Sequence, residues 1–449
     1  MKKLTALLLC LVIVFSFAAC AGHEVDDPAE VLPTAEESTA STVAETPSEP
    51  VTQGGSGASA VKALEEKYSG LKEDRLDWSF DPDSGTLTIT GEGPMRDYSE
   101  DVPAWDIHLE QIEKIVIGDE VTSIGATAFC GYPLNCDVHL GAAVEYIDRC
   151  AFYYSNIWTI NFPDGLKYIG EYAFNNAMLH SSTGFRLPDE LLYVGDKAFH
   201  SAMKEGEVSL PASLSYIGEE AFSNMFVSAF NVDEHNPSYC SADGVLYDKE
   251  RKTLICYPAD KQDTLFEIPE TVTEIRSGVI EATYTLEKIV IPAGVEKIEE
   301  GAIFWNYALT SIDVDENNKN YKSVDGVLYT ADGKTLLCYP IDCGRTAYTV
   351  LDGCEKLGAY SMSSATQLEV LFVPEGVKTL GSTALFSCAD LVQVSLPKSL
   401  AEIEDNNFIY CDSLGCINYA GNNEGWKRIV IGQENDNLST GAVQIICAE

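Results

Sequence analysis

A pattern of apolar residues, a glycine or acid, and an Ala-Phe pair recurs along most of this chain at a nearly constant interval. Each copy has the form apolar-x-x-apolar-Gly/acid-x-x-Ala-Phe, and the first runs from Val121 to Phe129. Clear copies end at Phe129, Phe152, Phe174, Phe199 and Phe222, and weaker ones at Ile280, Ile303, Met362, Leu385 and Phe408. Seven of the nine steps between these anchors are 22 to 25 residues long. A unit of that size is too small to enclose its own core, so neighbouring units must stack to bury their apolar residues.

A second element lies between the anchors and has the form apolar-x-x-apolar-x-apolar-Pro. It runs from Leu286 to Pro292, from Leu368 to Pro374 and from Leu391 to Pro397. The alternation of apolar residues indicates a short strand with one face turned inward. Proline ends the strand because it fixes φ and lacks the N–H donor. The chain is therefore predicted to form a β-rich solenoid of about ten coils of ~23 residues over residues 112–416.

The two long steps between anchors contain inserts near residues 231–267 and 313–349 that are copies of each other. The segment from Asp233 to Pro258 aligns with the segment from Asp315 to Pro340, 82 residues further on. Two apolar runs joined by a polar turn predict a β-hairpin in each insert. Two roles stay open for these hairpins: structural decoration, or a ridge that contacts a ligand.

The repeat is similar to the BspA-like class of leucine-rich repeats, found on surface proteins of bacteria and some protists. Residues 77–111, with Trp78 and Trp105, resemble the N-terminal cap of that family, and residues 417–449, with Trp426, resemble its C-terminal end. Caps are needed because each end of a solenoid otherwise exposes core and strand edge. The resemblance implies a leucine-rich-repeat solenoid that adheres to host or bacterial surface macromolecules. The fold by itself does not identify a ligand.

The N-terminus indicates export. Met1-Lys2-Lys3 precedes an apolar run that ends at Ala19, which is typical of a signal peptide. Phe17-Ala18-Ala19-Cys20 resembles a bacterial lipobox, in which the cysteine is lipidated and becomes the mature N-terminus. We therefore expect residues 1–19 to be a lipoprotein signal peptide and Cys20 to carry the lipid. An uncleaved anchor, or a plain signal peptide with an incidental cysteine, remains an alternative.

The segment after Cys20 has the composition of a tether. Residues 20–60 contain eight acids and four prolines but no Lys, Arg or aromatic residue, so they are predicted to be a disordered acidic linker. Residues 61–76 are predicted to form a short helix. Together these segments predict a protein held by its lipid on the extracellular face of the cell membrane.

A tyrosine column is the most distinctive candidate binding feature. The position just before the last Ile or Val of the anchor motif holds a tyrosine in four consecutive repeats: Tyr146, Tyr168, Tyr193 and Tyr216. A residue beside an inward-facing one points outward, so these rings are expected to form an exposed stripe. They would either stack to stabilise neighbouring coils, or form an aromatic platform for a sugar chain or partner protein.

Charge and motif content exclude several classes of function. The chain has 70 acids against 29 bases, a formal charge of −41, which argues against nucleic-acid binding and against a polybasic membrane contact. Because no catalytic motif is present, we expect no enzyme activity, catalytic residue, cofactor or metal. Twelve cysteines follow Cys20 and are expected to be mostly reduced and buried. Disulfides such as Cys338–Cys343 or Cys411–Cys416 stay open.

The sequence therefore predicts a cell-surface binding or adhesion protein that recognises an extracellular protein or glycan through a repeat solenoid. Two alternatives remain. One is a surface carbohydrate-capture protein that uses the tyrosine stripe, and the other is an architectural envelope protein without a diffusible ligand.

Overall fold

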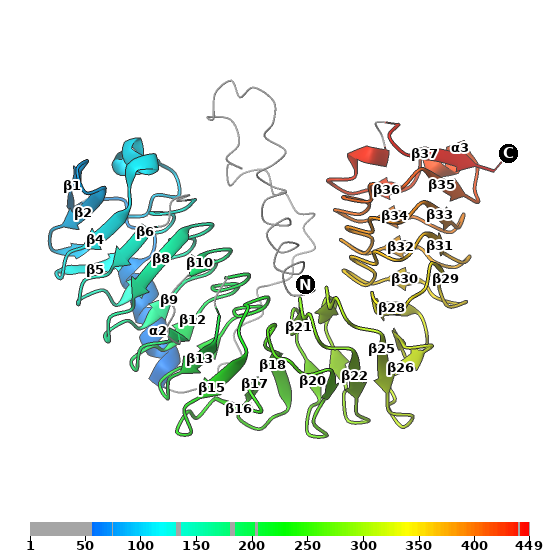
Figure 1. Ribbon diagram of the computed structural model, residues 1–449, viewed down its shortest axis with the longest axis horizontal. Coiled ribbons are helices and arrows are strands. Elements are labelled where there is room, and N and C mark those ends of the chain that lie inside the picture. Colours follow the sequence, from blue (N-terminus) through cyan, green and yellow to red (C-terminus); the bar gives the residue numbers. More distant parts are fainter. Residues whose placement is uncertain are drawn as a thin grey trace. The chain divides into compact units, whose positions relative to one another are not determined.

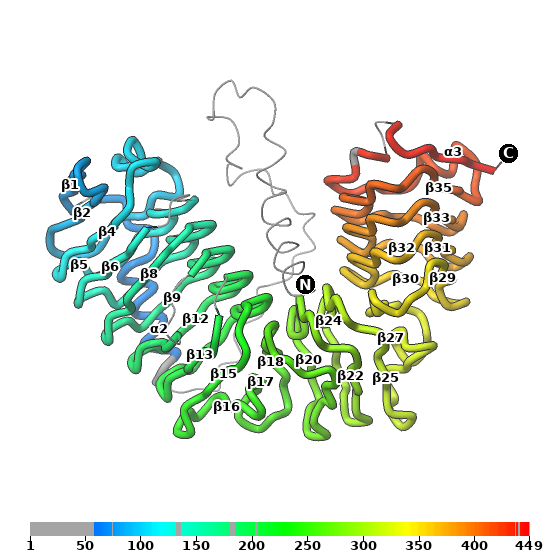
Figure 2. The backbone as a smooth tube through the Cα atoms, in the orientation of Figure 1, coloured from blue at the N-terminus to red at the C-terminus, as the bar shows by residue number. Residues whose placement is uncertain are grey.

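The computed structural model describes residues 56–73, 75–131, 136–179, 185–202, 205–438 and 441–448. In these residues the chain winds into successive coils, each stacked on the one before it (Figures 1 and 2). Each regular coil has a longer strand, which we call the long-strand face, a two- to four-residue strand, the short-strand face, and a tight turn segment that carries the Ala-Phe pair, the turn edge. The predicted leucine-rich-repeat solenoid is confirmed, with little helix and about 13 turns in the described chain. It exceeds ten coils because cap and insert strands continue the stack.

Four mainly parallel sheets form the long-strand face. In order of pairing they are β1 (Asp77–Asp81), β2 (Thr86–Thr90), β4 (Lys114–Ile117), β6 (Cys136–His139), β8 (Asn156–Asn161) and β10 (Met178–Leu179); β11 (Phe185–Arg186), β13 (Glu207–Leu210) and β15 (Ala229–Val232); β19 (Leu265–Glu267), β22 (Lys288–Ile291) and β25 (Ser311–Val314); and β29 (Ala347–Thr349), β31 (Val370–Phe372), β33 (Gln393–Leu396), β35 (Cys416–Tyr419) and β37 (Gln444–Cys447). The one antiparallel pair here is β1–β2, the hairpin predicted for the N-terminal cap.

Three sheets form the short-strand face. They are β3 (Gly93–Pro94), β5 (Val121–Ile124), β7 (Tyr146–Ile147), β9 (Tyr168–Ile169), β12 (Tyr193–Val194) and β14 (Tyr216–Ile217); β16 (Tyr239–Ala242), β17 (Val245–Asp248), β18 (Thr253–Cys256), β20 (Glu274–Ile275) and β23 (Lys297–Ile298); and β26 (Tyr321–Val324), β27 (Val327–Thr330), β28 (Thr335–Cys338), β30 (Lys356–Leu357), β32 (Thr379–Leu380), β34 (Glu402–Ile403) and β36 (Val430–Ile431). On the turn edge, β21 (Ile280–Glu281) pairs with β24 (Ile303–Phe304).

Few helices are present in the described residues. They are α2 (Ser56–Tyr68), α3 (Asn423–Trp426) and the 3-10 segments η1 (Ala104–Gln111) and η2 (Asp436–Leu438). The predicted bounds of 61–76 for the first helix are wrong, because α2 starts within the predicted linker and stops at Tyr68. Gly70, at φ +68°, accounts for the stop, since a glycine in the left-handed region just past the last turn is a common helix terminator.

A column of phenylalanine rings forms the centre of the first half of the core. Phe129, Phe152, Phe174, Phe199 and Phe222 are buried and stack with ring centroids 5.1–5.6 Å apart and interplanar angles of 3–19°. Trp105 of η1 stacks on Phe129 at 5.9 Å and closes the column at its N-terminal end. The repeat period thus places one large ring per coil at the same depth, as the pattern of anchors predicts.

The two predicted inserts are β-hairpins, β16–β17 and β26–β27, and each continues into a third antiparallel strand, β18 or β28. These third strands pair in parallel with the next coil, so the inserts belong to the short-strand face. The two copies make the same hydrogen bond to the preceding coil. Tyr239 Oη accepts from the Ile217 amide at 2.9 Å, and Tyr321 Oη accepts from the Ile298 amide at 2.6 Å.

On the turn edge, the coils on the two sides of each insert contact each other directly. Ser277 Oγ donates to Glu220 Oε1 at 2.8 Å, across the first insert, and Lys356 Nζ contacts Glu300 Oε1 at 2.8 Å, across the second. Apart from a small cluster beneath α2, the buried apolar side chains of the described residues likewise divide into three clusters that meet at the inserts. Each insert therefore adds strands to the two strand faces but not to the turn edge, and separates one block of core from the next.

Candidate functional site

The four tyrosines predicted as a binding stripe form a continuous ring stack on the short-strand face. Tyr146, Tyr168, Tyr193 and Tyr216 pair in register in adjacent parallel strands. Their ring centroids are 4.3–4.6 Å apart and their planes lie within 12° of parallel. The ring faces inside the stack are therefore occupied by neighbouring rings, and the stack presents mainly ring edges and hydroxyl groups to its surroundings.

Helix α2 covers the N-terminal part of this stack. Val61, Leu64 and Tyr68 are buried in one cluster with Tyr146 and Tyr168. Tyr68 also stacks on Tyr146 with centroids 5.2 Å apart. Spacing of i, i+3 and i+7 places the three α2 residues on one helix face. Figure 1 shows α2 lying across the short strands.

The prediction that the tyrosine stripe is exposed is therefore wrong for its first two members. Tyr146 is 2% and Tyr168 6% exposed, whereas Tyr193 and Tyr216 are half-buried. The cause is a segment about 80 residues upstream, whose packing on the solenoid leaves no trace in the repeat pattern.

Glu145 ties α2 to the solenoid. Its carboxylate accepts from Lys67 Nζ at 2.7 Å, from the Tyr68 hydroxyl, and from Lys167 Nζ at 2.9 Å. Burial alone raises a carboxyl pKa, but these three donors outweigh it and lower the pKa of Glu145 to about 2. Tyr168 Oη donates to Glu65 Oε1 of α2 at 3.1 Å. The polar contacts thus join helix and stack at two adjacent coils.

The turn edge carries a second set of aromatic residues that the sequence reasoning missed. Two positions per coil, two residues before and two after the anchor, recurrently have positive φ, for example Tyr172 and Tyr154 at 54° each. Their amides point at the next coil: the Tyr172 amide donates to the Asp196 carbonyl and the Tyr154 amide to the Asn175 carbonyl, both at 2.9 Å. This backbone geometry holds the side chains at the outer rim of each turn.

Aromatic side chains gather at two places along this edge. Tyr153, Tyr154 and Tyr172 form a cluster near the N-terminal end, with Tyr154 54% and Tyr172 37% exposed. Trp305, Tyr360, Phe386 and Tyr410 occur towards the C-terminal end, and Tyr410 is 42% exposed. For all of them except Tyr153 and Phe386, which directly follow an anchor, the signal that could have revealed them is the offset of two residues from an anchor.

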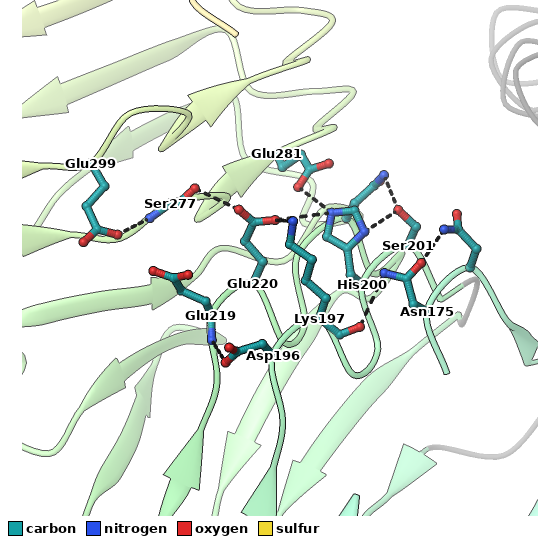
Figure 3. A network of polar contacts seen from close by, with 12 residues as sticks. Asn175, Asp196, Lys197, His200, Ser201, Glu219, Glu220, Ser277, Glu281 and Glu299 are labelled. Atoms are coloured by element: carbon teal, nitrogen blue, oxygen red, sulfur yellow. Dashed lines mark hydrogen bonds and ion pairs between the residues drawn. The ribbon is translucent and has the colours of Figure 1, made fainter. Parts of the chain in front are cut away.

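A polar network occupies the turn edge between these groups, where it passes the first insert (Figure 3). His200 Nε2 lies 3.5 Å from Glu281 Oε2 and 3.8 Å from Glu220 Oε2. Lys197 Nζ lies 3.2 Å from Glu220 Oε2. Glu281 is 1% exposed, so this network joins coils on the two sides of the insert through a buried carboxylate.

Both members of the central pair hold their protons more tightly than usual. Burial disfavours the imidazolium form, but Glu281 and Glu220 outweigh this and raise the pKa of His200. Burial raises the pKa of Glu281, and His200 opposes that shift only in part. A proton shared by the pair therefore avoids leaving a bare carboxylate in a dry environment.

Ser201, His200 and Glu281 superficially resemble a catalytic relay, since Ser201 Oγ lies 3.0 Å from His200 Nδ1. The arrangement lacks the other parts of such a site. Asn224 Nδ2 donates to Ser201 Oγ at 3.0 Å, and the Ser201 amide donates to the Ser223 carbonyl, so neither the hydroxyl nor its own N–H faces a vacant position. An acyl-transfer site needs N–H donors aimed at the developing oxyanion. The geometry fits a structural link between coils.

One small cleft opens at the second insert. Its cavity volume is about 10 Å³, and Phe304, Trp305, Tyr339 and Tyr360 contribute to its walls. The buried Ser361 hydroxyl at this cleft has no hydrogen-bond partner in the described residues. Sites for small organic ligands usually measure ~300–1,000 Å³, so this cleft is too small for such a ligand.

The twelve cysteines that follow Cys20 are free thiols in the structure, including Cys338, Cys343, Cys411 and Cys416. The two disulfides left open by the sequence are not formed. Burial raises the pKa of Cys136 and of Cys338 to about 12, which keeps both groups as unreactive thiols. These residues act as small apolar side chains in the core.

Other predicted features lie outside the described residues or have no counterpart within them. Cys20, the signal peptide and residues 20–55 are outside the described part of the chain. Across the residues that are described, no cluster of three His, Cys, Asp or Glu side chains is arranged to hold a metal ion. In the same residues, no helix combines the length and apolar character needed to cross a membrane.

The family model for the BspA type leucine-rich repeat region matches residues 108–228, 261–324 and 342–430, more than half of the sequence. The chain belongs to this BspA-type leucine-rich-repeat family. The gaps in the match, residues 229–260 and 325–341, contain β15–β18 and β27–β28. No curated protein matches the chain in sequence.

Solved structures extend the comparison of this BspA-type chain to the level of the fold. A leucine-rich repeat protein from Eubacterium ventriosum is 22% identical, with 77% of this chain and 82% of that chain covered and a TM-score of 0.51. A leucine rich cell surface protein from Faecalibacterium prausnitzii is 21% identical, with coverage of 80% and 97% and a TM-score of 0.46. The pneumococcal vaccine antigen PcpA is 19% identical, with coverage of 85% and 100% and a TM-score of 0.30. At these identities the likeness concerns the fold alone.

Proposed function

We propose that this BspA-type protein acts at the bacterial cell surface, where it binds an extracellular macromolecule through its turn edge. The observation that carries the proposal is the aromatic cluster of Tyr153, Tyr154 and Tyr172, of which Tyr154 and Tyr172 are exposed, on a backbone fixed by coil-to-coil hydrogen bonds. Rigid aromatic side chains provide large contact area at a small entropic cost and are enriched at binding interfaces.

The surrounding chemistry favours an uncharged or basic ligand. The protein carries 70 acids against 29 bases, so anionic ligands such as nucleic acid are repelled at long range. Tyrosines 154 and 172 give an uncharged contact area within that acidic surface. A protein or glycan outside the cell meets these requirements.

The carbohydrate-capture alternative loses its original basis. Sugar rings stack on the faces of aromatic side chains, but the faces in the Tyr146–Tyr216 stack are occupied by neighbouring rings and the first two rings lie under α2. We therefore propose that a glycan ligand would bind the turn edge. The architectural alternative predicts that the intact protein binds no soluble ligand.

A binding screen tests the proposal. The intact protein is measured against immobilised extracellular proteins and glycans, beside a Tyr154→Ser/Tyr172→Ser variant. If the ligand binds the turn edge, the double tyrosine variant should lose about 2 kcal/mol or more of binding free energy, which is roughly thirtyfold in affinity. Losses of this size are typical of central aromatic contacts. Phe372→Ser is the matched control, because Phe372 is an aromatic residue of similar exposure, 42%, on the long-strand face.

Unchanged affinity in the double tyrosine variant contradicts the turn-edge site. A protein that binds nothing in the screen favours the architectural function instead.

We also propose that a lipid on Cys20 holds the protein at the membrane, on the basis of the apolar run and the lipobox-like residues 17–20. Mass analysis of the mature N-terminus should detect the lipid. Cys20→Ala should release the protein from membranes, whereas unchanged retention of that variant excludes lipidation as the anchor.

A further inference from the structure

The surface formed by Tyr146, Tyr168, Tyr193, Tyr216 and Glu145, here called the tyrosine face, is chemically suited to an amphipathic helix. We propose that the tyrosine face is a helix-binding surface, that α2 occupies it as a releasable intramolecular cover, and that its external partner is a basic amphipathic helix with apolar residues at i, i+3 and i+7. This proposal concerns a different side of the coils from the turn edge and does not depend on it.

The contacts of α2 with the tyrosine face show which features a helix that binds there needs. The stacked rings present a strip of apolar ring edges. Val61, Leu64 and Tyr68 of α2 pack on this strip, roughly one side chain per helical turn. Glu145 lies at one end of the strip and accepts from Lys67 and Tyr68. Helix-in-groove recognition relies on this combination of spaced apolar anchors and a flanking charge pair.

The contact between α2 and the solenoid is small enough to be reversible. In the described residues, three apolar side chains of α2 join the buried cluster, and no backbone hydrogen bond links residues 56–68 to a strand. A helix of 13 residues is marginal on its own in water, so α2 depends on this contact. Gly70, whose Cβ position is open to solvent, provides a pivot directly after the helix.

The face extends further than the apolar contacts of α2. Tyr216 continues the ring stack but does not belong to the cluster that α2 buries, and Tyr193 is only partly covered. Asp196 and Glu171 act electrostatically on both of these tyrosines, and at Tyr216 Glu219 adds to them while Arg276 opposes them. An incoming helix therefore meets uncovered ring edges with an acidic border, which favours lysine or arginine beside its apolar residues.

A labelled synthetic peptide of residues 56–70 serves as the probe, with the full-length protein as receptor. In the Leu64→Glu protein, a buried charge expels α2, and the peptide should bind through the vacated face. In the wild type the face is free only in the minor state, so apparent affinity should be at least about tenfold weaker. A peptide carrying Leu64→Glu should bind neither protein.

Two variants separate this site from a general loss of structure. Leu265→Glu changes an exposed leucine, 45% exposed, on the long-strand face and should leave peptide binding at the wild-type level. Adding Tyr168→Ala to Leu64→Glu should remove the gained binding. If the Leu64→Glu protein keeps its β-sheet circular dichroism and gains no peptide binding, the helix-binding surface is wrong.

Hydrogen exchange of the wild-type protein gives an independent test that needs no variant. Amides of α2 should exchange at least about tenfold faster than those of β9 and β12, since the cover opens without unfolding the coils. Saturating peptide should increase the exchange of α2 further by competing for the face. Exchange of α2 as slow as that of the strands overturns the releasable cover.

Discussion

Replacing His200 with glutamine should destabilise the coils on either side of the first insert, and the loss should grow between pH 4.5 and 6.5. In the wild type the folded pKa values of His200 and Glu281 are both raised, so the stabilisation they give is complete on the acid side and is lost as pH rises through those folded values. Between the ordinary pKa values of 4.5 for Glu and 6.5 for His, the unfolded chain holds the histidine proton and has released the glutamate proton, whereas the folded pair holds at least the histidine proton. Wild-type stability should therefore change less with pH over this interval than that of a variant in which only the buried carboxyl titrates.

The His200→Gln variant has no imidazole to compensate for the buried carboxyl group of Glu281. Without the imidazole, buried Glu281 must stay protonated in the folded protein while the unfolded chain releases its proton above pH 4.5. Because the two ordinary pKa values differ by two units, the deficit should grow by up to about 3 kcal/mol between pH 4.5 and 6.5. This upper value is comparable to the ~3–5 kcal/mol found when one member of a buried ion pair is removed.

Urea unfolding of wild type and His200→Gln at several pH values measures the deficit. Because a repeat array can unfold block by block, hydrogen exchange of residues 199–223 and 277–304 should accompany it. His200→Gln/Glu281→Gln is the control and should show no such pH dependence. A His200→Gln deficit that is the same at pH 4.5 and 6.5 refutes the reasoning, because it means that the pair exchanges no proton on unfolding.

Three further predictions concern packing and the inserts. Phe174→Ala removes a ring from the centre of the stack and should cost about 3–5 kcal/mol in urea unfolding; a cost under about 1 kcal/mol would mean that neighbouring rings close the gap. Asn318→Ala takes away the amide that donates to the Pro292 and Val295 carbonyls and should cost about 1–3 kcal/mol, seen as faster exchange near the second insert only. Gly278→Ala should lower the melting temperature more than Gly70→Ala. Both glycines have positive φ, but only at position 278 would the added Cβ lie 2.7 Å from Glu220 Cγ. Equal shifts in melting temperature would contradict this close contact.

The periodic part of the fold follows from the sequence because it depends on neighbours 22 to 25 residues apart. Val121, Ile124 and Phe129 are fully buried, as the anchor pattern predicts, and the same depth recurs in later coils. The hairpins were predictable for a similar reason, since two copies of one insert share their turn and strand residues.

Contacts between segments outside the period were not predictable in this way. Tyr168 looks outward-facing within its own repeat, yet Leu64, about a hundred residues earlier, covers it. His200 and Glu281 are 81 residues apart and meet only because the turn edge passes the first insert. The positive-φ turn positions hold residues as different as Lys197, Glu220 and Tyr172, so no residue type marks them.

The absence of disulfide cross-links between coils in the described chain has a mechanical consequence. The twelve cysteines after Cys20 are free thiols, so apart from the backbone itself only hydrogen bonds, ion pairs and packing hold one described coil to the next. A coil of about 23 residues adds ~5 Å to the stack but releases roughly 80 Å of chain when it is pulled straight. Under tension the stack would therefore lengthen in large steps, and the inserts that divide the core are where each step would be expected to stop.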